Sequence, residues 1–147
     1  MKPGLVDHLT GECRPCWRGK IHAVSASVAL PAGVALTYLS SYRVVTGIYA
    51  FALFVTLATS AIYHCLSRSP QQQLVLRRLD HAMIFVLIAG TWTPLCLVSM
   101  SPRAAAALLC LTWLVAALGI TLALSWRATK LKDSLYFVGG AIAATVM

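Results

Sequence analysis

The sequence predicts an all-α integral membrane protein that forms one domain of apolar helices. Its 147 residues are 59% hydrophobic and 11% charged, with a mean hydropathy of +0.79. Soluble domains are about 45–50% apolar and about 25% charged, so both values indicate a membrane protein. Long apolar runs alternate with short polar connections, which is the pattern of consecutive membrane-spanning helices.

Five apolar segments follow a polar N-terminal tail, residues 1–20. A spanning helix needs about 20 mostly apolar residues. The segments long enough are residues 21–39, 44–64, 80–100 and 104–126. The fifth segment, residues 135–147, is too short to cross alone and is predicted to be an incomplete span. Ser, Pro and Arg punctuate the connections, as expected at helix ends.

The basic residues predict the orientation of these spans. The net charge is +8, and ten of the twelve Lys and Arg residues lie in the tail, after the second span or after the fourth. The two others are Arg43 and Arg103. The positive-inside rule therefore predicts a cytoplasmic N-terminus in the plasma membrane. Because the cations separate apolar runs, they favour membrane lipids as partners and exclude a nucleic-acid-binding face.

The tail does not resemble a cleavable signal peptide. Acidic residues and Pro15 are scattered through it, and no cleavage-site pattern follows a short apolar core. We expect the first span to insert as an uncleaved anchor.

Three polar residues stand out at the ends of two consecutive spans. Ser60 and His64 are four residues apart, so they share one helix face, and Asp80 is expected to begin the next helix. An ionisable group at a membrane span indicates a functional site. The set suits a metal site, in which imidazole binds zinc and the carboxylate and hydroxyl support a bound water, or a proton relay.

A purely structural interpretation of the same residues also stands. Ser and His at a helix end are often interfacial, and Asp80 at a helix start would complement the helix dipole. A catalytic zinc site needs about three protein ligands, whereas this pattern offers one histidine.

Other candidate ligands carry weaker signals. Cys13 and Cys16 form a single C-x-x-C without a second pair, which disfavours a zinc ribbon, and the odd count of five cysteines disfavours a disulfide framework. His22 is expected at the membrane interface, and His81 is expected to pack against a neighbour or lipid headgroups.

Three stretches together resemble the hemolysin III family, which groups with the progestin and adipoQ receptors and the alkaline ceramidases. They are Ser60-Ala-Ile-Tyr-His64, Arg77-Arg-Leu-Asp-His-Ala-Met-Ile-Phe85 and Ile88-Ala-Gly-Thr-Trp-Thr-Pro94. The order S-x-x-x-H, D-H and G-T-x-T-P over consecutive spans carries the likeness, which runs from about residue 18 to the end.

The resemblance implies a seven-helix membrane bundle, of which this chain would hold the first four to five helices. It also implies zinc near the cytoplasmic face. His64 would be one ligand, Asp80 would hold the metal-bound water or act as base, and Ser60 would support them. The family's other two ligands come from H-x-x-x-H in the seventh span, a motif missing from residues 1–147. The chain is therefore expected to be C-terminally truncated.

The function that this implies is zinc-dependent hydrolysis of an amide or ester in a lipid, with the metal site incomplete in this chain. Three alternatives remain open from the sequence: a membrane-perturbing or pore-forming protein, a receptor-like protein of lipid homeostasis with structural zinc, and a non-functional fragment.

Overall fold

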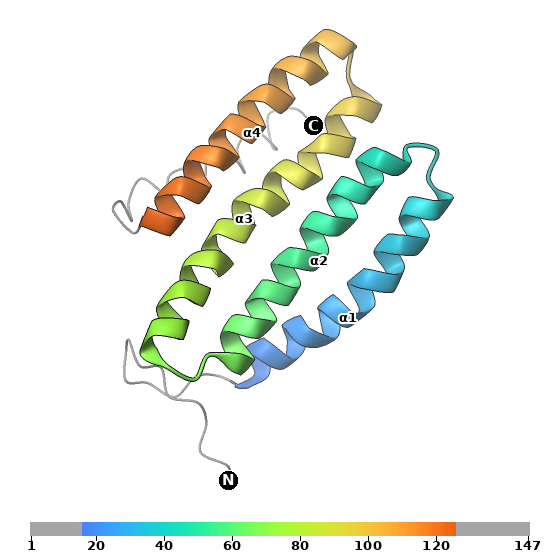
Figure 1. Ribbon diagram of the computed structural model, residues 1–147. Helices are drawn as coiled ribbons and strands as arrows, with labels where there is room; N and C mark the ends of the chain where they lie inside the picture. The colour runs from blue at the N-terminus through green and yellow to red at the C-terminus, as the bar shows by residue number, and fades with distance from the viewer. Residues whose placement is uncertain (1–15, 126–147) are drawn as a thin grey trace.

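The computed structural model describes residues 16–125, which form antiparallel helices joined by short turns (Figure 1). They are α1 (Cys16–Leu39), α2 (Arg43–Leu66), α3 (Pro70–Ser99) and α4 (Pro102–Ser125). All four are long and apolar enough to cross a membrane, and the described residues contain no strand. The all-α membrane fold predicted from hydropathy is confirmed. The incomplete fifth span, residues 135–147, lies outside the described residues.

The four helices lie side by side as one layer. Within residues 16–125, α1 packs on α2, α2 on α3 and α3 on α4, and no other helix pair is in contact. Figure 1 shows the α2–α3 turn beside the start of α1, and the other two turns at the opposite end of the layer. We call the end with the α2–α3 turn the Asp80 end, and the end with the other two turns the Arg43 end.

Helix α3 begins ten residues earlier than the span predicted from hydropathy. Ser69 caps it by accepting a hydrogen bond from the Gln72 backbone N–H at 3.2 Å, and Pro70 occupies the first helical position. The Gln72 side chain in turn accepts from the Arg68 N–H at 3.2 Å. These caps fix the start of the helix in a polar stretch, so Asp80 lies three turns inside α3 and not at its first residue.

Small residues bring α3 close to α4. The Phe85 ring is 1% exposed and packs with Ala89 and Ala116, and it lies directly against the backbone of Gly119. A side chain at position 119 would overlap that ring. Nearer the Arg43 end, the Trp113 indole N–H donates to the Thr93 hydroxyl at 3.3 Å.

A hydroxyl joins α2 to α3 in the middle of the layer. The Thr56 Oγ1 lies 2.7 Å from the Ala52 carbonyl of its own helix and 3.1 Å from the Met83 carbonyl of α3. Nearby, a Cβ at Gly90 would lie 2.5 Å from the Ala52 methyl. The two contacts pair Thr56 with Met83 and Ala52 with Gly90, which fixes the antiparallel register of α2 and α3.

Candidate functional site

The start of α1, the end of α2 and the first half of α3 all lie at the Asp80 end, and α2 is the helix that contacts both others. Gly19 makes the close approach of α1 to α2 possible. A Cβ built on it would lie 2.5 Å from the Cys65 Sγ and 2.9 Å from the His64 Cβ. Because those distances are shorter than van der Waals contact, only glycine fits at this crossing.

His64 is half-buried between two other rings. Its imidazole stacks on His22 of α1, with ring centroids 6.1 Å apart and an interplanar angle of 14°. The Tyr63 ring lies at 4.7 Å from it, tilted by 53°. These contacts orient the imidazole at the α1–α2 interface.

The helix register brings Asp80 level with Ser60. Thr56 lies opposite Met83, so one further turn toward the end of α2 places Ser60 opposite Asp80. His64 follows one turn later, about 6 Å along the axis. Ser60 is buried and Asp80 is half-buried. The register places Ser60, His64 and Asp80 at the same end of the layer, on the neighbouring helices α2 and α3.

Asp80 carries the one negative charge of residues 16–125, because the three other acidic residues of the chain lie outside that range. It is the eleventh residue of α3, whose first turn holds no acidic residue. The alternative in which Asp80 complements the helix dipole is therefore wrong. An ionisable residue inside a spanning helix makes Asp80 a candidate functional residue.

Cationic and polar side chains of α3 itself lie near Asp80 in the sequence. Arg77 and Arg78 are half-buried and precede Asp80 by three and two residues, and Gln73 is completely buried. The His81 Nδ1 lies 2.7 Å from the Arg77 carbonyl. Since a carbonyl only accepts, the His81 Nδ1 is the donor of this hydrogen bond.

The described residues do not by themselves hold a metal. Among residues 16–125, no three His, Cys, Asp or Glu side chains lie close enough together to bind one ion. A zinc site that used His64 would have to draw its remaining donors from outside this range. Cys13 lies outside the described residues, and Cys65, Cys96 and Cys110 are free thiols.

The stack of His22 on His64 is not predicted by the sequence pattern. His22 was expected at the interface, and its sequence position alone gives no partner. The available signal was Gly19, one turn earlier on the same face, because a glycine near a helix start permits a close crossing.

The chain resembles two curated bacterial proteins. It is 29% identical to "Hemolysin-3" of Bacillus cereus over 67% of this chain and 48% of that protein. It is 28% identical to the "Hemolysin-3 homolog" of Bacillus subtilis (strain 168) over 81% of this chain and 59% of that protein. The chain thus spans about half the length of these relatives. No solved structure matches it.

A family model agrees with these relatives and with the motifs at the Asp80 end. The model described as "Haemolysin-III related" matches residues 12–147, which is nearly the whole chain. It covers all four described helices, including the positions of Ser60, His64 and Asp80. This multi-pass membrane protein therefore belongs to the haemolysin-III related family.

Proposed function

We propose that this chain supplies the N-terminal part of a zinc-dependent membrane hydrolase that cleaves an amide or ester bond in a lipid. The observation that carries the proposal is that Ser60, His64 and Asp80 lie at the same end of the helix layer, on the neighbouring helices α2 and α3. In the sequence, the α2–α3 connection and the first ten residues of α3 separate Asp80 from Ser60 and His64. The register of α2 and α3 nevertheless brings Asp80 level with Ser60.

Each residue has a role that its position supports. His64 would hold the metal through a ring nitrogen, and the stack on His22 restricts the orientation of the imidazole. Zinc, when bound, supplies Lewis acidity. Asp80 would accept a proton from water, and Ser60, one turn from His64 on the same helix, would support the two residues by hydrogen bonding.

The charges support a cytoplasmic position for this site in the plasma membrane. Arg18, Lys20, Arg68, Arg77 and Arg78 all lie at the Asp80 end, whereas Arg43 and Arg103 lie at the other. Under the positive-inside rule, the Asp80 end and the N-terminus face the cytoplasm.

The test uses protein isolated from its native membrane, with its intact mass and its zinc content measured together. We expect about one zinc per chain, lost in His64→Ala and retained in His81→Ala, a histidine at the same end that serves as the matched control. The intact mass shows whether the protein that holds the metal has the 147 residues of this chain or is longer.

Two results would overturn the proposal. Zinc content that His64→Ala leaves unchanged would remove His64 as a ligand, and native protein without zinc would remove the metal chemistry altogether. For the reaction itself, release of a fluorescent acyl group from a lipid amide or ester should disappear in Asp80→Asn while zinc remains bound. Turnover that persists in Asp80→Asn contradicts the assignment of the base.

A further inference from the structure

A second feature lies at the Arg43 end, away from the candidate hydrolase site. An apolar groove of about 420 Å³ runs between α1 and α2. Small, half-buried residues form its depth: Ala29 and Gly33 on α1, and Gly47 and Ala50 on α2. Its volume lies within the range of about 300–1,000 Å³ that is usual for small-molecule sites.

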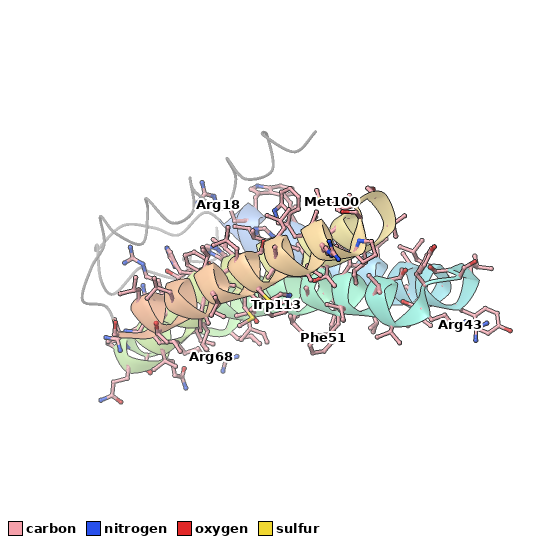
Figure 2. The ribbon with its side chains drawn as sticks, turned by 90° about the horizontal axis from the view of Figure 1, so that it is seen from above. Arg18, Arg43, Phe51, Arg68, Met100 and Trp113 are labelled. Carbon is pink, nitrogen blue, oxygen red and sulfur yellow. The ribbon has the colours of Figure 1, made fainter. Side chains whose placement is uncertain are left out.

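The groove faces away from the candidate site. Phe51 lines it and extends from the helix layer into open space (Figure 2). Phe51 and Ser60 are nine residues apart on α2, which places them on opposite sides of the helix. The groove and Ser60 therefore lie on opposite sides of the helix layer.

A polar hollow continues the groove beyond the end of the helices. It is about 690 Å³ in volume and is formed by residues of the α1–α2 turn, from Tyr38 to Val45. Tyr38 and Arg43 line both hollows. Together they form an apolar groove along the helices that opens into a shallow polar hollow at the α1–α2 turn.

Arg43 is the one charged residue among those that line the two hollows in the described structure. Its guanidinium lies 5.6 Å from the centroid of the Tyr38 ring, a cation–π contact that holds the charge at their junction. It is also the first residue of α2, and Tyr42 before it makes no side-chain cap. The first-turn N–H groups of α2 therefore add positive potential at the same place.

The polar group nearest the apolar depth is already satisfied. The Thr37 hydroxyl donates to the Gly33 carbonyl at 2.7 Å, and its methyl is turned toward Gly47. The groove thus offers apolar surface along its length and one positive centre at its mouth. A free anion uses only the mouth and an uncharged lipid only the groove, whereas an anionic phospholipid uses both.

We propose that the α1–α2 groove binds one acyl chain of an anionic phospholipid, whose phosphate contacts Arg43 and the start of α2. The charge of a basic residue near an anionic headgroup corresponds to about a fivefold preference over an uncharged one. This site is independent of the proposed zinc chemistry at the Asp80 end.

Native mass spectrometry of the full chain tests the proposal. The detergent is doped in turn with phosphatidylglycerol and phosphatidylcholine of identical acyl chains. We expect about fivefold stronger retention of phosphatidylglycerol by the wild type, and loss of that preference in Arg43→Gln. The matched control is Arg103→Gln, the other arginine at the same end, which should keep it.

A second pair of variants tests the apolar part. Val34 lines the groove and is 63% exposed, whereas Val28, also on α1, is 61% exposed and lies outside it. Val34→Phe should weaken retention of both lipids severalfold without unfolding the chain, and Val28→Phe should not. An excess of inorganic phosphate should not displace the lipid.

Three outcomes would overturn the proposal. If Arg43→Gln and Arg103→Gln show the same preference for phosphatidylglycerol over phosphatidylcholine, Arg43 does not bind the lipid headgroup. If inorganic phosphate displaces the lipid, the site binds anions in general and the acyl chain contributes nothing to binding. If Val34→Phe converts a dimer into a monomer and leaves lipid retention unchanged, a second copy of the chain fills the groove.

Discussion

The crossing of α1 over the end of α2 depends on the absence of a side chain at Gly19. In Gly19→Ala the new methyl would lie 2.9 Å from the His64 Cβ, whereas ordinary contacts begin at 3.4 Å. The overlap with Cys65 Sγ, at 2.5 Å, involves the end of a side chain that can rotate, but the His64 Cβ is fixed to the backbone. Helix α1 must therefore move away from α2.

The expected change in unfolding free energy can be estimated from two opposing effects. Overpacking a tight contact destabilises by about 1–3 kcal/mol. Replacing Gly by Ala inside a helix stabilises by about 0.5–1 kcal/mol, and by less in the first turn, where Gly19 lies. We expect Gly19→Ala to lose about 1–2 kcal/mol, measured by unfolding the chain with SDS in mixed micelles and following tryptophan fluorescence.

Gly47→Ala, at the other end of the same helix pair, is the matched control. Its methyl would meet only the Thr37 Cγ2, at 3.5 Å, which is an ordinary contact. This variant should keep or gain up to about 1 kcal/mol, so the two glycines should respond with opposite signs. Cys65→Ala in the Gly19→Ala background should recover part of the loss, because it removes one of the two overlaps. A Gly19→Ala chain as stable as Gly47→Ala would refute the close crossing and, with it, the orientation of His64 by His22.

Three further predictions concern the helix layer itself and use the same unfolding assay. Thr56→Val removes the hydroxyl between α2 and α3 and should cost about 0.6–1 kcal/mol, and an unchanged midpoint would mean that this contact contributes nothing. Ser69→Ala should cost about 1 kcal/mol and speed hydrogen exchange of the Gln72 amide, and an unaltered exchange rate would contradict the cap. Gly119→Ala should cost about 1–3 kcal/mol through the Phe85 ring, with recovery in the double variant that adds Phe85→Leu, and equal losses in both would refute that contact.

The sequence was sufficient to predict the helices because hydropathy and helix length follow directly from the bilayer. The span predicted at residues 44–64 corresponds to α2 at Arg43–Leu66, and that at 104–126 to α4 at Pro102–Ser125. Hydropathy did not predict where α3 begins. Hydropathy finds the part of a helix that a membrane accepts, whereas the cap at Ser69 sets where the helix begins, ten residues before Asp80.

The sequence was enough to predict which residues form the candidate site, but it did not predict how they lie relative to one another. The spacing of Ser60 and His64 places both on one helix face, since helical periodicity is local. The level of Asp80 depends on the register of two helices, which small residues such as Gly90 set through contacts distant in sequence. The stack of His22 on His64 arises from a tertiary contact in the same way. The ligand and base roles of His64 and Asp80 stay predictions until zinc is measured.

The arrangement of the helices, each packed only on its neighbours in the chain, has a consequence for biosynthesis. Such contacts join residues that are close in sequence, so the contact order is low and folding should be rapid. Each helix that emerges from the ribosome finds its docking surface already in the membrane. No helix of the described layer has to wait for a distant segment, so the layer can assemble one hairpin at a time during translation.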